Sequence, residues 1–178
     1  QNQVSAPLEN MFRPHSFVPR TSLDLTSWSR VLTKVELQLL LRCHQMLQDL
    51  SLQGYNKEFP ENLSSHSHLK TLRISRSPSR FPDRLHSLDL SSSAQQFDPK
   101  QCPTLPVTLQ HINLTNCLRI TDSTIHKFLH PCLRLVTLRL DGVSQLTDET
   151  LIRLTSHLSC LEHVFLCRLY KITDRGMM

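Results

Sequence analysis

Glycine and aromatic residues are scarce in this chain, and long apolar runs are missing. Only three of the 178 residues are glycine, which excludes a glycine-rich phosphate loop. The G-x-S-x-G, H-E-x-x-H and paired-carboxylate patterns are absent as well. No run of about 18 apolar residues could cross a membrane. We therefore expect a folded protein that is not an enzyme, binds no cofactor or metal and has no membrane partner.

Regularly spaced cysteines are also missing. The six cysteines show no paired spacing, and several lie where an apolar side chain would serve. A buried free thiol behaves as a small hydrophobic group, whereas disulfide frameworks belong mostly to secreted chains. No export signal is found at the start. We expect reduced thiols and a cytoplasmic or nuclear location.

An excess of acidic residues is absent, since the net charge is +5 and the pI is about 9.1. Such a charge would attract acidic partners or nucleic acid. Because few aromatic residues accompany the basic ones, we expect a solvated surface and no nucleic-acid partner. Part of the charge comes from one basic run, which comprises Lys70, Arg73, Arg76, Arg80 and Arg84.

The chain does repeat one short motif. Ile120-Thr121-Asp122 recurs as Leu146-Thr147-Asp148 and as Ile172-Thr173-Asp174, at one constant step. A second motif, L-x-x-L-x-L, recurs at the same step from Leu109 and from Leu135. Two independent sets of positions therefore share one period.

The first half carries the same L-x-x-L-x-L motif at a shorter and variable step. Its central residues Leu50, Leu72 and Leu88 lie progressively closer together along the chain. The segment Ser75–Asp83 contains two prolines, which disfavour a helix. We expect an extended connection in its place. The copies are Leu47 to Leu52, Leu69 to Ile74 and Leu85 to Leu90, with Leu23 and Leu25 as a first one.

Each 26-residue unit of the second half predicts one strand and one helix. In L-x-L both leucines lie on one face of a strand. After a turn, Asp122 and Asp148 are placed to cap helices, and apolar residues follow at helical spacing. Because one strand and one helix cannot enclose a core, such units must stack and share one.

The stretch Leu109–Cys117, followed by the Ile120 motif, resembles the cysteine-containing leucine-rich repeat of F-box proteins. Val143 and Leu169 replace Cys117 in the later copies and keep the position apolar. The resemblance implies an α/β leucine-rich-repeat solenoid. Such a solenoid is curved, with parallel strands on its concave face and helices or extended segments on its convex face.

The chain divides into three regions. Residues 1–20, with three prolines, are expected to form an N-terminal tail or linker. Residues 21–108 are expected to form irregular repeats and residues 109–178 regular ones. Because the chain starts at Gln1 and only four residues follow its last motif, we expect a fragment that is truncated at the C-terminus.

Residues between the stacked leucines are expected to point outward and form a concave wall that grips a protein partner. Phe165 and Arg139 carry this prediction, because aromatic residues and arginine are enriched at binding hot spots. Phe165 packing beneath a following repeat is the alternative. The predicted contact residues are Arg73, Asp89, His111, Asn113, Thr137, Arg139, Asp141, His163 and Phe165. The rest of the wall is Asp49, Ser51, Gln53, Thr71, Ser75, Ser87, Thr115 and Cys167.

Two groups of histidine and cysteine resemble partial metal sites. One is Cys160 with His163 and Cys167, and the other is the pair His126 and His130 on one helix face. Each group lacks further ligands that a metal would need. We expect surface side chains rather than a metal centre.

The segment from Arg76 to Arg80 reads Arg-Ser-Pro-Ser-Arg. A phosphate on a serine there would lie among arginines and could order the loop. A plain connecting loop with solvated charges is the alternative.

In the family that the chain resembles, the repeats hold the protein to be ubiquitinated and an F-box docks on the ligase adaptor. The resemblance therefore implies the substrate-recognition part of an SCF-type ubiquitin ligase. Adaptor and cullin would be partners only if an F-box lies outside this sequence. A scaffold or inhibitor of the same repeat type is the alternative, and a catalytic or RNA-binding protein is a third possibility.

Overall fold

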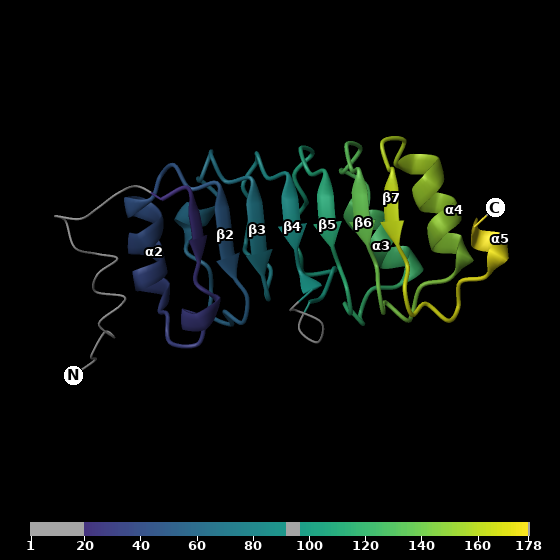
Figure 1. Ribbon diagram of the computed structural model, residues 1–178, viewed down its shortest axis with the longest axis horizontal. Helices are drawn as coiled ribbons and strands as arrows, with labels where there is room; N and C mark the ends of the chain where they lie inside the picture. The colour runs from purple at the N-terminus through teal and green to yellow at the C-terminus, as the bar shows by residue number, and fades with distance from the viewer. Residues whose placement is uncertain (1–19, 92–96, 178) are drawn as a thin grey trace.

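Seven short strands follow one another both along the chain and across a single sheet (Figure 1). The structure is a computed structural model that describes residues 20–91 and 97–177. Every neighbouring pair of strands is parallel. The predicted α/β fold with a parallel sheet is confirmed at this level. The strands are β1 Ser22–Asp24, β2 Asp49–Leu52, β3 Thr71–Ile74, β4 Ser87–Asp89, β5 His111–Asn113, β6 Thr137–Arg139 and β7 His163–Phe165.

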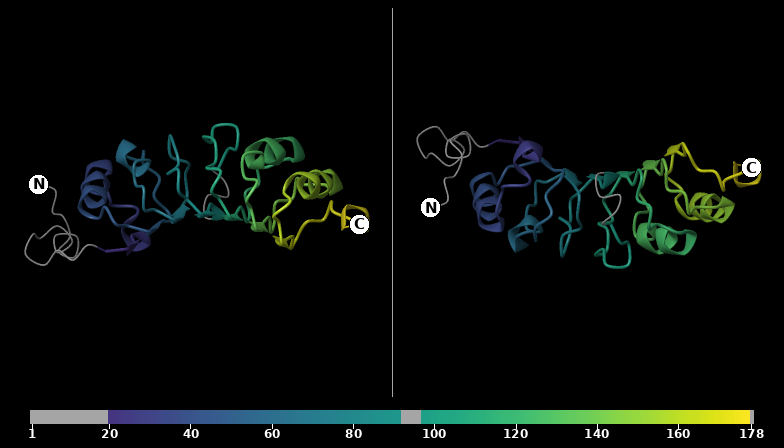
Figure 2. Two further views of the ribbon diagram at one scale, coloured as in Figure 1. Left: turned by 90° about the horizontal axis from the view of Figure 1, so that it is seen from above. Right: turned by 90° about the horizontal axis from the view of Figure 1, so that it is seen from below.

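The helices lie on one side of this sheet. Figure 2 shows α2, α3 and α4 on the same side, and we call the sheet surface that faces away from them the open face. The α-helices are α2 Lys34–Cys43, α3 Asp122–Leu129, α4 Asp148–His157 and the short α5 Asp174–Met177. Two 3-10 turns, η2 Thr26–Trp28 and η3 Glu61–Leu63, complete the described elements. The predicted tail, residues 1–20, lies outside the described residues except for Arg20.

The central apolar residues of the strands form one row across the sheet. Register pairs join Leu23 to Leu50, Leu72 and Leu88 in turn, and then to Ile112, Leu138 and Val164. All but the last of these residues are at most 3% exposed, whereas Val164 on the outermost strand is 37% exposed. The buried members of the row, from Leu23 to Leu138, belong to one continuous core between the sheet and the helical side.

No helix forms between β3 and β4. The residues from Ser75 to Asp83 form bends and irregular backbone, so the helix that their two prolines disfavour is absent there. Phe81 is buried there at 2% exposure, and both prolines are buried as well. One aromatic side chain and two prolines therefore take the place that a helix occupies elsewhere.

The caps of α3 and α4 differ from the sequence prediction. Thr121 and Thr147, not Asp122 and Asp148, occupy the cap positions, and each aspartate is the first helical residue. In α3 the backbone N–H of Thr121 donates to Thr124 Oγ1 over 2.8 Å. The prediction was wrong because Thr and Asp are both good cap residues, and the sequence does not say which of two neighbours begins the helix.

The two aspartates instead join successive units. Asp122 accepts hydrogen bonds from the backbone N–H and the hydroxyl of Thr147, both over 2.9 Å, and from the hydroxyl of Thr150. Asp148 accepts the equivalent pair from Thr173, both over 2.7 Å. Burial by itself would raise the pKa of Asp122, but the hydrogen bonds from Thr150 and Thr147 outweigh it and lower the pKa.

Candidate protein-binding surface

The predicted contact residues lie on the open face in two rows beside the buried central row. One row contains His111, Thr137 and His163, which are register partners across β5, β6 and β7. The other row contains Arg73, Asp89, Asn113, Arg139 and Phe165, which are register partners from β3 to β7. The alternation of the strands therefore brings eight of the nine residues to one surface, while Asp141 follows β6.

Exposure differs within this set. Arg73, His111, Arg139, His163 and Phe165 are exposed, whereas Asp89, Asn113 and Thr137 are half-buried. The exposed members are the ones that a partner could reach without rearrangement of the strands.

Three residues that were predicted on the wall are buried, which corrects that prediction. Asp141 is 6% exposed, Ser51 is 5% exposed and Ser75 is 7% exposed. Ser75 Oγ accepts a hydrogen bond from the backbone N–H of Gly54 over 2.5 Å, and Ser51 shares one with Thr26 over 3.0 Å. Ser51 lies within β2, whereas Ser75 and Asp141 follow β3 and β6, where alternation no longer applies. All three short side chains bond to neighbouring backbone or side chains instead of reaching solvent.

A group of three side chains, which we call the Arg139 cluster, lies at the C-terminal end of the open face. The guanidinium carbon of Arg139 lies 4.5 Å from the centre of the Phe165 ring. Arg139 also donates to Asp141 Oδ2, over 3.4 Å from Nε and over 3.3 Å from an Nη atom. The ring on one strand and the carboxylate therefore hold one arginine in a defined position.

Asp141 is the fixed point of this cluster. Its second oxygen, Oδ1, accepts a hydrogen bond from the backbone N–H of Cys167 over 2.8 Å. Burial by itself would raise the pKa of Asp141, but the hydrogen bonds from Cys167 and Arg139 lower it below the usual range. Asp141 therefore stays ionised and orients Arg139 rather than contacting a partner itself. This role leaves no signal in the sequence, because one of the bonds comes from Cys167, which follows the neighbouring strand β7.

Phe165 points outward on the open face, 41% exposed, beside Arg139. Its neighbour Val164 continues the buried central row by register and is 37% exposed. An exposed aromatic ring held by a cation is a favourable anchor for a protein partner, because it offers a large apolar area with little loss of side-chain freedom.

Charge is unevenly distributed along the open face. Strands β1 to β4 carry Asp24, Asp49 and Asp89 with only Arg73 to balance them. Strands β5 to β7 carry Arg139, His111 and His163, and the carboxylate of Asp141 there is buried. The two ends of the face therefore differ in charge, which would favour one orientation of a bound partner.

The two histidine and cysteine groups do not form a metal centre. Cys160, His163 and Cys167 are all exposed. Across residues 20–91 and 97–177, no group of three or more His, Cys, Asp or Glu side chains could hold a metal ion. His126 and His130 do share a face, and the sequence reasoning missed their third neighbour, His157, whose ring stacks on His130 at 4.7 Å. The Nε2 atom of His157 lies 3.0 Å from the carbonyl oxygen of His130, at an adjacent helix.

The cysteines are free thiols of two kinds. Cys117 and Cys132 are buried, whereas Cys43, Cys160 and Cys167 are exposed. Burial raises the pKa of Cys132 to about 12, so this thiol is unreactive at neutral pH. Cys102 is half-buried and packs against the core, and burial raises its pKa to about 12 as well. The prediction that thiols replace apolar core residues therefore holds for Cys117 and Cys132 and in part for Cys102.

No family model matches the chain, and a search of curated proteins finds no significant match. In the part of the chain that the structure describes, none of the helices has the length and apolar character needed to span a lipid bilayer.

Proposed function

We propose that the chain is a leucine-rich-repeat solenoid whose open face is concave and binds a protein partner. The Arg139 cluster is the observation that carries this proposal. It presents an exposed phenyl ring and a guanidinium group at 4.5 Å from each other, and aromatic residues and arginine are enriched at binding hot spots. The shared register of the apolar row supports the repeat assignment.

We further propose that the partner is a protein destined for ubiquitination and that the chain is the recognition part of an SCF-type F-box subunit. The support is the resemblance of Leu109–Cys117 and the Ile120 motif to the repeats of that family. In this proposal an F-box elsewhere in the full-length protein recruits the adaptor and the cullin. Free thiols, three of them exposed, fit a reducing cytoplasmic or nuclear location.

Affinity purification of the full-length protein tests both parts. The double variant Arg139→Ala/Phe165→Ala should lose a specific partner that the wild-type protein retains, while thermal melts show that it is still folded. Ile152→Ala/Arg153→Ala is the matched control, because it also removes one exposed apolar residue and one arginine, but from α4 on the helical side. Equal loss in both variants, or in neither, would contradict the assignment of the open face.

The same purification separates a ligase subunit from a scaffold. Co-purification of the adaptor and cullin, with ubiquitin transfer to the captured partner, supports the ligase proposal. A partner that is retained by Arg139 and Phe165 without adaptor or cullin indicates a scaffold or inhibitor of the same fold instead. Binding of RNA with a steep salt dependence would contradict both proposals.

A further inference from the structure

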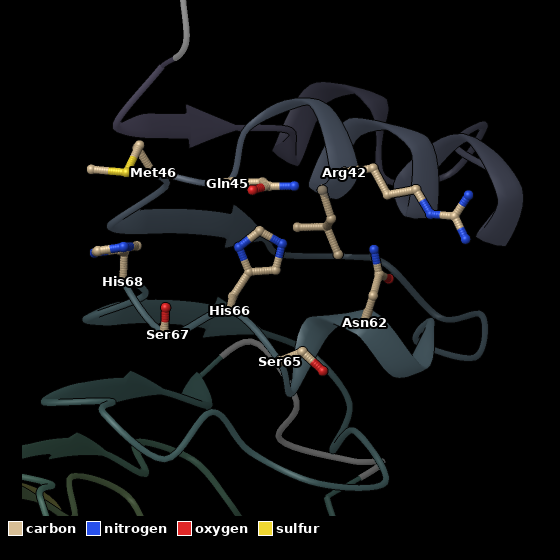
Figure 3. A pocket seen from close by; sticks show the side chains of 9 residues that line it. Arg42, Gln45, Met46, Asn62, Ser65, His66, Ser67 and His68 are labelled. Carbon is tan, nitrogen blue, oxygen red and sulfur yellow. The ribbon is translucent and has the colours of Figure 1, made fainter.

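The pocket at His66 has a volume of about 350 Å³ and lies between the turn after α2 and the turn after η3 (Figure 3). Figure 3 shows the polar groups of Arg42 and Ser65 pointing away from the His66 ring. The Nδ1 atom of His66 and the Oδ1 atom of Asn62 are buried, so a molecule in the pocket could not reach them. The pocket therefore brings no set of polar groups together, and we assign it no ligand.

The connection between β3 and β4 contains a different feature, a serine that follows an arginine by three residues. Figure 2 shows this connection on the same side of the sheet as the helices. Protein kinases select their substrates by the pattern of charges around the serine or threonine, and an arginine at this distance is one such pattern. Within residues 20–91 and 97–177, the same spacing occurs at Thr33, Ser79, Ser87, Thr137 and Ser156.

Local structure separates Ser79 from the other residues of this set. Ser87 and Thr137 are half-buried in strands. The hydroxyls of Thr33 and Ser156 form hydrogen bonds with neighbouring residues of helices α2 and α4. Ser79 lies exposed in a bend, and no described residue forms a hydrogen bond with its hydroxyl. Ser79 is therefore the member of the set that a kinase could reach without opening a helix or a strand.

The neighbouring Ser77 is a poor position for a phosphate. It is half-buried, and its hydroxyl donates to Cys102 Sγ over 3.2 Å. Asp98 lines the same small pocket. A phosphate on Ser77 would lose hydration and would lie close to a like charge. Arg76, by contrast, is exposed and gives up one hydrogen bond, to the carbonyl oxygen of Asn56 over 3.2 Å, when it moves to a kinase.

A pocket of about 560 Å³ beside Ser79 has room for a phosphate. Ser79, Arg80 and Asp83 all line it, as do residues 103–107 of the connection between β4 and β5. Arg80 Nη2 donates to both carboxylate oxygens of Asp83, over 3.0 and 3.2 Å. This ion pair is exposed and therefore weak. A phosphoserine carries a charge of about −2, so it attracts Arg80 more strongly than Asp83 does and repels the carboxylate.

We propose that Ser79 is a phosphorylation site and that its phosphate takes Arg80 from Asp83. The phosphoryl donor is MgATP, and the catalyst is a protein kinase that selects arginine at this spacing. A bond forms between Ser79 Oγ and the γ-phosphorus of ATP while the bond from that phosphorus to the bridging oxygen breaks. ADP leaves, and the hydroxyl proton passes to the catalytic base of the kinase. None of these residues belongs to the open face, so the proposal is independent of partner binding there.

Phosphorylation in vitro tests the first part. The folded full-length protein is incubated with MgATP and a purified kinase that selects arginine three residues before the serine, and mass spectrometry locates the phosphate. One phosphoryl group should enter Ser79, whereas Ser77 and Ser156 should remain unmodified. Modification of Ser77 or Ser156 at the same rate, or none of Ser79, overturns the proposal.

Two variants test whether Arg76 directs the kinase. Arg76→Ala should lower the rate of Ser79 phosphorylation at least tenfold. Arg84→Ala is the matched control, because it removes another exposed arginine of the same connection and should leave the rate unchanged. Thermal melts show whether the variants are folded, and Arg76→Gln, which keeps a donor for Asn56, replaces Arg76→Ala should that variant unfold. An equal fall in both variants contradicts recognition through Arg76.

A ³¹P NMR titration of the phosphorylated protein tests the transfer of Arg80. The second pKa of a phosphoserine is about 6, and a guanidinium beside it should lower this pKa, because a positive charge favours the dianion. Arg80→Ala should raise the midpoint by about 0.5 pH unit or more, whereas Arg84→Ala should not change it. Equal midpoints in the wild-type protein and Arg80→Ala contradict the transfer. These readouts do not depend on partner capture, so failure of the open-face proposal would leave them unchanged.

Discussion

The N-terminal and C-terminal halves of the sheet reach the same register by different routes. From β5 to β7 the central residues Ile112, Leu138 and Val164 recur at one constant interval, and α3 and α4 lie in the connections. Between β3 and β4 the connection is much shorter, since Leu88 follows soon after Leu72, and it contains no helix. The strand motif therefore sets the sheet, and the helical side is replaceable as long as something apolar fills it.

Single aromatic residues fill that side where the described residues of a connection form no α-helix. Phe81 lies in the connection between β3 and β4, and Phe97 in the connection between β4 and β5, with exposures of 2% and 1%. The Phe97 ring packs edge-on against Phe128 of α3, with centroids 5.4 Å apart. Phe97 thus joins the irregular half to the regular one through side-chain contact.

Removal of a central leucine should cause the largest loss of stability. Leu138→Ala should lower the free energy of unfolding by about 2–5 kcal/mol, because it opens a cavity in the buried row. Leu72→Ala in the N-terminal half should cost a similar amount, since both leucines are 0% exposed. Urea melts measure both values. A much smaller loss at Leu72 would show that the irregular half packs loosely and would break the comparison.

The aspartate bonds between units should stabilise the regular half, where they occur. Asp122→Ala removes the acceptor of Thr147 and Thr150, and we expect a loss of about 1–3 kcal/mol, because buried donors lose their partner. Ser123→Ala, its exposed neighbour in the same helical turn, is the control and should change the melt by less than about 0.5 kcal/mol. In the Asp122→Ala variant, the hydrogen exchange of backbone amides should become faster in α4 than in α2, each compared with the wild-type protein.

The next largest loss of stability should follow from substitution of the glycine in the turn after β6. Gly142 has φ +71°, and an added Cβ would collide with the Asn116 side chain. We expect Gly142→Ala to cost about 1–3 kcal/mol from backbone strain. Asn116→Gly/Gly142→Ala should recover part of the loss, because it removes the collision, keeps the strain at position 142 and adds none at position 116, where φ is +60°. Identical melts for the single and double variants would show that the collision contributes nothing.

Acid should loosen the N-terminal half first. His44 and His66 are buried there, and burial lowers the pKa of both below the usual 6.5. In the unfolded chain they bind protons near pH 6.5, so unfolding is favoured as the pH falls below that value and is unaffected above it. Cys132 and Leu158 occupy the same turn position in the C-terminal half. Replacing both histidines with leucine should flatten the fall in stability between pH 7 and pH 5, measured by urea melts.

The smallest expected effect on stability is at the open face. Phe165→Ala should change the free energy of unfolding by less than about 1 kcal/mol, because the ring is 41% exposed, yet weaken partner capture. A loss comparable to that of Leu138→Ala would place Phe165 in the core and contradict its proposed role.

The sequence was sufficient for the strands and for the side on which each residue lies. Leucine spacing alone placed Leu72, Leu138 and their counterparts inward, because alternation within a strand is local. It was insufficient wherever the partner lies one unit away. Local sequence predicts a helix cap at Asp122, because its threonine partners lie 25 and 28 residues further along the chain.

For the candidate site, the sequence likewise predicts which residues share a surface but not the contacts between units. Arg139 and Phe165 were expected on one surface, but the carboxylate that orients Arg139 was expected to be a contact residue. Asp141 is buried because the backbone of Cys167 on the following unit approaches it. The pocket at His66 gave no sequence signal, since its walls come from two separate turns.

The connections between strands differ in length and in helix content while the strands keep their register, so a connection is a convenient place to insert a label. Since connections as different as those after β3 and β5 lead to equally aligned strands, a reporter can be inserted into the connection after β3 without reshaping the open face. The exposed bond between Ser79 and Arg80 is a natural insertion point for an epitope or fluorophore. A label at this point would stay attached to the folded protein and would leave the open face unobstructed.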